Sequence, residues 1–552
     1  MDIAGDSKLN DGGKDRGGSM PAWMKWAWMV AGLVPIVAMS GWTASLLRRM
    51  VDVGMQEDAM IGMRHLRNLL DGKGLVYNPG EGVVGVTDPL FWLGSALFHV
   101  PGKFLGASDL IVSHYAYVWG VVVVALVLLA TLGKGARMPL AAGMGALLFA
   151  YFVAPLRFMF LGLEGPFLLL SVGVLGWLYR RATPTVFYAA AAFLSWNRPE
   201  VAIAALPLLV FFSLFRVREH GWVRALGPVV VGGAVFPLTL WLLTGSPIVQ
   251  TIVAKSYFGA RISLSQMLMG LGGRLEQISS FLEKGQHSAL LLTVIVTAIA
   301  AHDFVRFLVS KPKSAPSAAL LYSMFCVAYT GFIILVPNLW EWYITNWLGF
   351  VLVLLAGRFA ALVDVATLRS PRFQLTTVVA VLVGVAILVR PQQPVRRALT
   401  TSLHTWLKQE NEFRGRLGRE LATEWNAKSV WMEAVGWQGY YNSARVFDEV
   451  GLVDRDTLAL AKKFKCRYFV AALLELKPQF IVKRRFEVEQ NRLMLSPKSC
   501  PGAPLFESDA DRALFFQHYE LVREYNTEIP DLFGEYSYLN LYRLRESPLT
   551  QG

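Results

Sequence analysis

The chain has few cysteines and no evident internal repeat. Only three of its 552 residues are cysteine: Cys326 lies inside an apolar run, and Cys466 and Cys500 lie near the end. Their spacing matches no metal-ligand set, although the later pair could form a disulfide if it is exported. The absence of a repeat excludes a repeat array. The first apolar run has no small-residue cleavage site ahead of a soluble body, so we expect it to be retained.

Apolar residues are what the chain has in excess. Hydrophobic residues make up 54% of it and charged residues 17%, and its mean hydropathy is +0.42. A soluble domain needs far less apolar surface, so this composition predicts a polytopic α-helical membrane protein. The net charge of +13 comes mostly from short loops between apolar runs, where basic residues set orientation in a bilayer. We therefore expect a lipid bilayer, and no nucleic acid, as partner.

Apolar runs predict about eleven transmembrane helices at roughly 20 residues each. Residues 1–21 are polar and predict a disordered cytoplasmic tail. From a cytoplasmic N-terminus, alternation of the helices places the basic loops inside and the membrane-level carboxylates outside. The predicted spans lie near 26–46, 111–132, 138–156, 162–179, 184–197, 200–215, 225–244, 288–306, 317–336, 344–363 and 374–390.

The composition changes near residue 390. Residues 391–552 are charged and aromatic and contain no run able to span a membrane. Their patterns predict strands at 467–472 and 480–482 and a helix at 456–464. We expect a C-terminal mixed α/β domain on the extracytoplasmic face.

The most informative segment follows the first apolar run. Residues 48–110 form a predicted external loop that places carboxylates, arginines and glycine-rich turns at the membrane surface. Ionisable groups at that depth are tolerated only where protein or a water-filled cavity surrounds them, which indicates a site. Glu57 and Asp58 begin an amphipathic helix there. Acidic residues also suit a helix N-terminus without any catalytic role.

This loop resembles that of polytopic glycosyltransferases of the GT-C fold, in particular the family of the mycobacterial terminal arabinofuranosyltransferase. The matching segments are Glu57-Asp58-Ala59-Met60-Ile61, Arg64-His65-Leu66-Arg67-Asn68-Leu69, Gly72-Lys73-Gly74-Leu75-Val76-Tyr77-Asn78-Pro79-Gly80-Glu81 and Gly85-Val86-Thr87. Later matching elements are Gly162-Leu163-Glu164, Arg198-Pro199-Glu200, 247–255, 436–452 and Lys477-Pro478-Gln479-Phe480. The chain departs from the family at Glu57, an aspartate there, at Gln250, an asparagine there, and at Val86, a tyrosine there.

The resemblance implies a GT-C fold, with residues 22–390 as the transmembrane module and 48–110 as its catalytic loop. It also implies an enzyme that moves a sugar, with arabinofuranose the leading candidate, from a polyprenyl-phosphate donor to an envelope glycan or glycoprotein. The location implied is the outer face of a bacterial inner membrane. The sequence leaves open whether the transfer inverts or retains the anomeric centre. Two alternatives are a transporter or flippase of lipid-linked sugars and a non-catalytic glycan-assembly subunit.

The predicted site residues form three groups. Asp58, with Glu57 beside it, is the predicted catalyst, because a carboxylate can deprotonate an acceptor hydroxyl or stabilise the reacting sugar. The predicted ligands of the donor phosphate are Arg64, Arg67, Asn68, Arg198, Lys255 and Arg261. The predicted substrate contacts are Asn78, Glu81, Thr87, Glu164, Glu200, Trp340 and Glu341.

Some of these residues suit a second interpretation equally well. Arg198 and Arg261 also suit snorkelling or ion pairs with neighbouring glutamates. Trp340 and Glu341 lie in an aromatic segment that suits stacking on a sugar and also an interfacial aromatic belt. We predict no metal or cofactor, and a divalent cation bound by the carboxylates stays an open alternative.

Overall fold

The computed structural model describes most of the chain between residues 55 and 545, with gaps in that range. The described residues are 55–104, 109–130, 162–258, 287–309, 318–336, 343–351, 353–354, 411–526 and 538–545, with single residues between 37 and 48. Several predicted features lie outside them: the tail at 1–21, most of the span at 26–46, the spans at 138–156 and 374–390, and the side chains of Arg261, Trp340 and Glu341.

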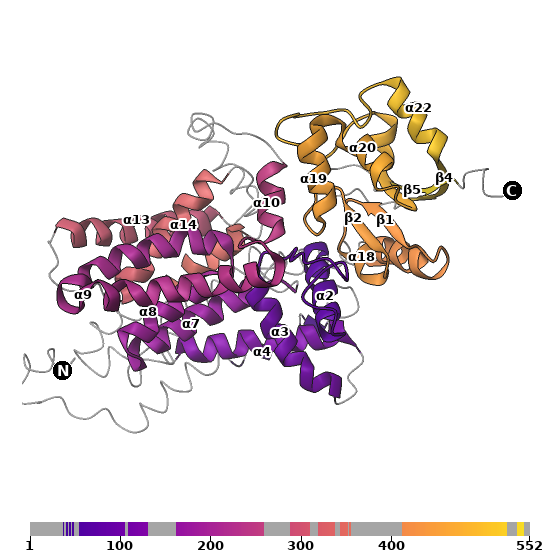
Figure 1. The fold of residues 1–552 in the computed structure, drawn as a ribbon. Helices are drawn as coiled ribbons and strands as arrows, with labels where there is room; N and C mark the ends of the chain where they lie inside the picture. Colours follow the sequence, from indigo (N-terminus) through magenta and orange to yellow (C-terminus); the bar gives the residue numbers. More distant parts are fainter. Residues whose placement is uncertain are drawn as a thin grey trace, which may run out of the picture.

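The first part of the chain is helical (Figure 1). Its helices are α2 (Glu57–Leu70), α3 (Pro89–Phe104), α4 (Leu110–Ala130), α7 (Gly165–Arg181), α8 (Pro184–Ser195), α9 (Pro199–Thr244), α10 (Gln250–Tyr257), α13 (His287–Val309) and α14 (Ala318–Leu335). Among the described residues, two helical stretches are long and apolar enough to cross a bilayer, Leu110–Leu128 and Pro199–Thr244. The predicted number of spans therefore stays a prediction.

The spans predicted at 200–215 and 225–244 are the two halves of α9. Gly221 interrupts the helix with φ 75° and ψ 163°, a conformation that glycine adopts at little cost. At 1.5 Å per residue, the half before Gly221 is roughly 33 Å long, enough to cross a hydrocarbon core. The second half packs closely on α8, because a Cβ at Gly232 would lie 2.1 Å from the Ala189 carbonyl oxygen.

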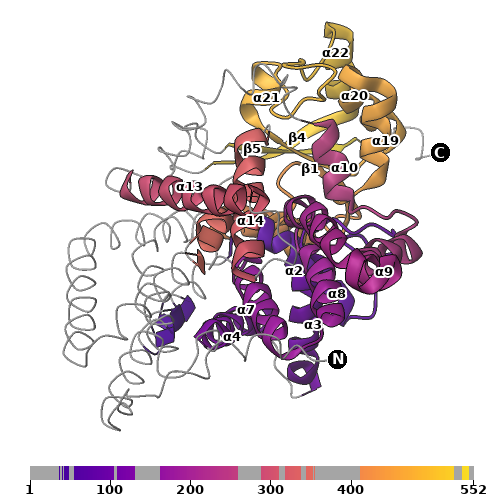
Figure 2. The ribbon, with the colours of Figure 1, turned by 90° about the vertical axis from the view of Figure 1, so that its left-hand side faces the viewer.

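Helices α7, α8 and the two halves of α9 follow one another with alternating direction. Glu164 and Arg198 precede α7 and α9, so both lie at one end of this bundle. Arg181 and Arg218 lie at the opposite end, because α7 finishes and the first half of α9 turns back there. In Figures 1 and 2, α2 and α10 lie beside the C-terminal domain. The end of the bundle that carries Glu164 and Arg198 is the end that faces this domain.

The C-terminal domain contains a five-stranded mixed sheet with the order β2-β1-β3-β5-β4. Strand β1 pairs in parallel with β2 and β3, and β5 pairs antiparallel with β3 and β4. The strands are β1 (Ser429–Met432), β2 (Arg445–Asp448), β3 (Phe480–Arg484), β4 (Tyr519–Tyr525) and β5 (Leu539–Leu544). The helices are α18 (Trp437–Tyr441), α19 (Arg455–Phe464), α20 (Tyr468–Glu475), α21 (Arg485–Glu489) and α22 (Asp509–His518), with a 3₁₀ turn at Lys465–Arg467. The predicted α/β class of this region is confirmed.

Local predictions within the domain had mixed outcomes. The helix predicted at 456–464 is α19, and the strand predicted at 480–482 begins β3. The strand predicted at 467–472 is wrong, because most of it belongs to α20, whose first six residues are all buried. A short apolar run that is buried on every side shows neither helical nor strand periodicity. The alanines and leucines that follow favour the helix.

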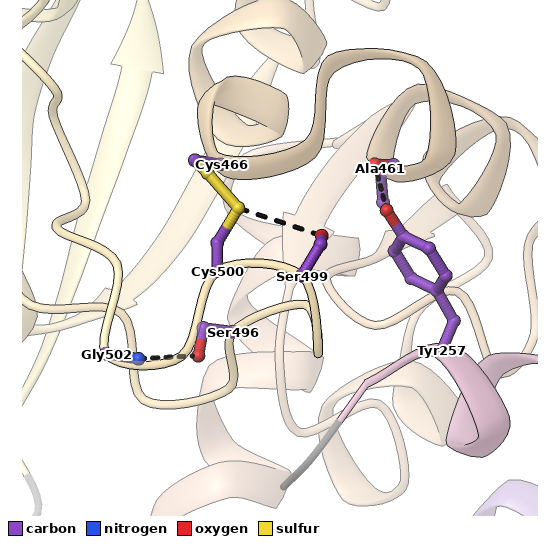
Figure 3. The surroundings of a disulfide bond; sticks show 7 residues. All are labelled: Tyr257, Ala461, Cys466, Ser496, Ser499, Cys500 and Gly502. Atoms are coloured by element: carbon purple, nitrogen blue, oxygen red, sulfur yellow. Dashed lines mark hydrogen bonds between the residues drawn. A yellow bond between two sulfur atoms is a disulfide. The ribbon is translucent and has the colours of Figure 1, made fainter. Parts of the chain in front are cut away.

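Cys466 and Cys500 form a disulfide, with Cα atoms 5.5 Å apart (Figure 3). Cys466 lies in the turn after α19, and Cys500 lies in a loop before α22. The third cysteine, Cys326, is a buried free thiol in α14. The bond therefore joins two segments of the C-terminal domain that are 34 residues apart in sequence.

Candidate active site

Six ionisable side chains from five segments interact at the end of the helical bundle that faces the C-terminal domain. We call this set the charge cluster. Its members are Asp58 in α2, Asp88 before α3, Glu164 before α7, Arg198 and Glu200 at the start of α9, and Lys255 in α10. Five of these six residues were predicted from the sequence as site residues, and the structure brings them together.

Arg198 is the centre of the buried part of the cluster. Its guanidinium forms ion pairs with Glu164 and with Glu200, the latter at 2.5 Å between Nε and Oε1. Burial alone would lower the pKa of Arg198, but the two carboxylates outweigh it and raise that pKa well above its ordinary value. Removing one partner of such a buried pair would leave an uncompensated charge. Arg198 therefore holds both glutamates in place.

Asp88 is a member of the cluster that sequence reasoning missed. Its Oδ1 accepts a hydrogen bond from Trp92 Nε1 at 3.1 Å, and its carboxyl group also interacts with that of Glu164. Burial, and next the charge of Glu164, raise the pKa of Asp88 well above its ordinary value. Asp88 directly precedes Pro89 at the start of α3, where its carbonyl accepts a hydrogen bond from Phe91 N. The sequence feature that could have identified Asp88 as a site residue is the position of a carboxylate directly before an apolar helix.

Asp58 and Lys255 differ from the other members because both side chains keep some exposure to solvent. Burial raises the pKa of Asp58, while the positive charges of Lys255 and Arg198 lower it. Burial likewise lowers the pKa of Lys255, and Asp58 raises it. Each charge therefore stabilises the other in a largely desolvated place. Asp58 and Lys255 are therefore the members of the cluster that a substrate can approach most readily.

Glu57 lies next to Asp58 in sequence but points to the C-terminal domain. Its Oε1 accepts from Gly436 N at 2.6 Å and its Oε2 accepts from Trp437 N at 3.1 Å. Arg414 lies 3.9 Å away as an ion-pair partner. Consecutive helical residues point about 100° apart, so one of the two carboxylates enters the cluster and the other anchors the domain. The structure thus gives Glu57 an anchoring contact, and a catalytic role for this residue stays a prediction.

Three residues predicted to bind the donor phosphate contact backbone carbonyls instead. Arg64 donates to Gly439 O at 2.6 Å, to Ala444 O at 2.7 Å and to Tyr77 O at 3.0 Å. Arg67 donates to Tyr440 O. Asn68 donates to Val76 O and Tyr77 O, both at 2.9 Å. These donors therefore already have partners in the turn and in the C-terminal domain, which gives them a structural role; their binding of the donor phosphate stays a prediction.

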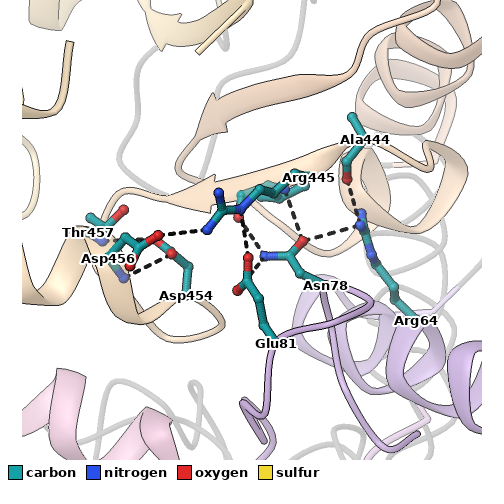
Figure 4. A network of polar contacts seen from close by, with 9 residues as sticks. Arg64, Asn78, Glu81, Ala444, Arg445, Asp454, Asp456 and Thr457 are labelled. Carbon is teal, nitrogen blue, oxygen red and sulfur yellow. Dashed lines mark hydrogen bonds and ion pairs between the residues drawn. The ribbon is translucent and has the colours of Figure 1, made fainter. Parts of the chain in front are cut away.

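The turn at Asn78–Glu81 docks on β2, the edge strand of the sheet (Figure 4). Asn78 accepts from Val446 N at 3.0 Å and donates to Val446 O at 2.9 Å. Glu81 forms an ion pair of 2.7 Å with Arg445, which also pairs with Asp456 at 2.6 Å. The side chain of Asn78 thus satisfies backbone groups of an exposed sheet edge. Asn78 and Glu81, predicted as substrate contacts, are occupied in this interface.

The remaining predicted residues add little to the site. Thr87 is partly buried beside Asp88. Within the described part of the chain, no group of three or more histidine, cysteine, aspartate or glutamate side chains is arranged to hold a metal ion. The cluster itself contains one carboxylate and one ammonium group on partly buried residues, Asp58 and Lys255, and four buried charged residues.

Comparison with known proteins finds one family model and a set of solved structures. A family model described as a domain of unknown function (DUF8728) matches residues 402–542, and no curated protein matches the chain. The structure of ArnT from Cupriavidus metallidurans bound to undecaprenyl phosphate is 13% identical, with a TM-score of 0.47 over 92% of this chain and 97% of that chain. An oligosaccharyltransferase from Archaeoglobus fulgidus, tethered with an acceptor peptide, is 12% identical, with a TM-score of 0.49 over 94% of this chain and 74% of that chain. Likenesses at this level do not by themselves establish a family.

Proposed function

We propose that this chain is a polytopic membrane glycosyltransferase of the GT-C type that moves a sugar from a polyprenyl-phosphate donor to an acceptor hydroxyl. The observation that carries the proposal is the meeting of reachable Asp58 and Lys255 in the charge cluster, at the end of apolar helices. A lipid-linked phosphate sugar needs an apolar path for its chain, a cation for its phosphate and a base for the acceptor. We assign these three needs to the apolar helices, to Lys255 and to Asp58, respectively.

Asp58 is the proposed general base. The acceptor oxygen attacks the anomeric carbon, its proton passes to the Asp58 carboxylate, and the bond between the anomeric carbon and the phosphate oxygen breaks. The products are the glycosylated acceptor and the polyprenyl phosphate. This describes the inverting course. In the retaining course, the same carboxylate would stabilise or bond the anomeric centre.

Lys255 is the proposed ligand of the departing phosphate. A cation held in a desolvated place stabilises the charge that grows on the phosphate as the bond breaks. Arg198 is already paired with two carboxylates, so its proposed part is to keep Glu164 and Glu200 fixed and to support ionised Asp58. Thr87, Glu164 and Glu200 stay predicted substrate contacts: the two glutamates belong to the cluster, and Thr87 directly precedes Asp88.

The resemblance of the first loop supports arabinofuranose as the sugar, with decaprenyl-phosphate arabinofuranose as the donor and an envelope glycan or glycoprotein as the acceptor. The proposed location is the bacterial inner membrane, with a cytoplasmic N-terminus. The disulfide between Cys466 and Cys500 supports an extracytoplasmic C-terminal domain, because disulfides persist in oxidising compartments.

The direct test is a transfer assay with the purified full-length protein in lipid nanodiscs. Radiolabelled decaprenyl-phosphate arabinofuranose is supplied with a panel of envelope glycans and glycoproteins. We expect label in an acceptor and an equal amount of released polyprenyl phosphate. In proteoliposomes, movement of the donor across the bilayer without transfer would instead indicate a transporter. Binding with neither reaction would indicate a glycan-assembly subunit.

A further inference from the structure

Helix α10, which carries Lys255, is attached at its beginning to the first external loop. Gln250 N donates to Val84 O at 3.1 Å, and the Thr251 hydroxyl donates to Gly85 O at 2.7 Å. The side chain of Gln250 also donates to Gly451 O of the C-terminal domain at 3.0 Å. These bonds place the first turn of α10 between the loop and the domain.

The last two residues of the α10 segment, Tyr257 and Phe258, are attached to the C-terminal domain. The Tyr257 hydroxyl donates to Ala461 O at 2.7 Å, and Lys498 N donates to Tyr257 O at 2.9 Å (Figure 3). The next residue, Phe258, forms a β-bridge with Pro497 and is 5% exposed. Its ring lies 5.6 Å from that of Tyr468 within the buried cluster of the domain. The end of α10 is thus part of the core of the C-terminal domain.

The disulfide joins the two segments that hold Tyr257. Ala461 belongs to α19, and Cys466 follows that helix by two residues. Lys498 precedes Cys500 by two residues in the loop on the other side. Figure 3 shows Tyr257 and the bond between Cys466 and Cys500 in the same neighbourhood. Both hydrogen-bond partners of Tyr257 therefore lie close to one covalent crosslink, which limits how far they can move apart.

Lys255 and Tyr257 point to different sides of α10. Two residues along an α-helix correspond to a rotation of roughly 200°. With Tyr257 directed to α19 in the C-terminal domain, Lys255 is directed to the other side, where its charge interacts with Asp58. The rotation of α10 about its own axis therefore decides whether the ammonium group reaches the charge cluster.

We propose that Tyr257 is a positioning residue, through which the C-terminal domain fixes Lys255 at the phosphate end of the charge cluster. This inference rests on the proposed function of Lys255. It gives the C-terminal domain a part in donor binding that does not require the domain to touch the donor. The hydroxyl of Tyr257 acts on the orientation of Lys255, and Lys255 acts on the phosphate.

The test measures binding of farnesyl phosphate, a short analogue of the lipid phosphate, to the full-length protein in nanodiscs. Tyr257→Phe removes the hydrogen bond to Ala461 and keeps the ring. A hydrogen bond of ordinary strength predicts that farnesyl phosphate binds roughly three- to tenfold more weakly. Farnesol, which lacks the phosphate, is expected to bind equally to all variants. Tyr257→Phe is expected to have no further effect when Lys255→Met is already present, because the two residues act in series.

Tyr519→Phe is the matched control. The Tyr519 hydroxyl donates to Pro478 O at 3.0 Å in the same domain, away from α10. We expect it to lower the unfolding temperature as much as Tyr257→Phe does and to leave farnesyl phosphate binding unchanged. If both variants weaken binding equally, or if Tyr257→Phe binds like the wild type, the positioning role is overturned. If Lys255→Met itself binds farnesyl phosphate normally, the proposed phosphate site fails as well.

Discussion

The environment of Asp58 makes its pKa a measurable property of the site. Burial raises that pKa and Lys255 lowers it. Lys255→Met removes the positive charge, so the Asp58 carboxylate becomes harder to ionise and its pKa rises further. A base must be ionised to accept a proton, so we expect the acidic limb of the kcat/KM profile to move to higher pH in this variant. Profiles of initial transfer rate against pH for the two proteins give the shift.

Lys73→Met serves as the control for this shift. Lys73 lies in the same external loop but is exposed, with Asp71 as its ion-pair partner at 3.6 Å. Its removal is expected to leave the acidic limb in place. An acidic limb that stays at the same pH in Lys255→Met would contradict the assignment of Asp58 as the base that Lys255 supports.

Individual residues show how far the sequence could predict the site. Asp58, Glu164 and Lys255 were recognisable because charges at membrane level are costly and indicate function. The sequence predicted that Arg64 binds the donor phosphate and that Asn78 contacts the substrate. Guanidinium and amide groups that can bind phosphate or sugar can equally bind backbone groups of the protein. Their real partners, such as Gly439 for Arg64, are 375 residues away in sequence. No local pattern can show such a partner.

Among the elements, the contact between the first external loop and α18 is packed most closely. A Cβ at Gly439 would lie 1.6 Å from the Tyr77 hydroxyl oxygen, and Tyr77 is fully buried. Gly439→Ala therefore forces Tyr77 and the neighbouring Arg64 to move. Overpacking of this kind costs about 1–3 kcal/mol, and we expect a lower unfolding temperature together with weaker sugar transfer.

Gly227→Ala is the comparison for this change. Gly227 lies in α9 with nothing within 4 Å of the position of an added Cβ, and alanine is the better helix former. We expect this variant to unfold at the wild-type temperature or above. Equal losses in the two variants, measured by thermal unfolding in the same detergent, would show that the contact at Gly439 is not a tight one.

Elements also mark where sequence patterns fail. The two apolar halves of α9 were predicted at nearly the right residues because their length and hydropathy are strong signals. Helix α20 was predicted as a strand, since its buried apolar run carried no periodicity to separate the two structures. The sequence alone could not predict how α10 positions Lys255. The residues that contact α10 lie in a loop and in a domain that are far away in the sequence.

At the scale of the whole molecule, the proposed topology places the C-terminal domain and the turn of α9 on opposite sides of the membrane. The native thiols suit a labelling experiment, because Cys326 is buried and Cys466 and Cys500 are bonded. Exposed Ala510 in α22 and exposed Glu219 before the break in α9 are suitable reporter positions.

We expect Ala510→Cys to react with an impermeant maleimide added outside intact cells, and Glu219→Cys to react only after the membrane is opened. The first half of α9 separates the two sides, so the result reports its crossing. Labelling of both reporters from the same side, with unmodified protein as the blank, would contradict the topology.

The central claim is that the charge cluster around Asp58 performs sugar transfer, while Glu57 anchors the C-terminal domain. The most direct measurement compares single-turnover transfer from decaprenyl-phosphate arabinofuranose by wild type, Asp58→Asn and Glu57→Gln. Loss of a general base predicts a rate at least about 100-fold lower for Asp58→Asn. We expect Glu57→Gln to keep the rate within about tenfold and to unfold at a lower temperature, because it weakens two hydrogen bonds to the domain. Wild-type transfer by Asp58→Asn, or a larger loss of rate in Glu57→Gln, would contradict the account.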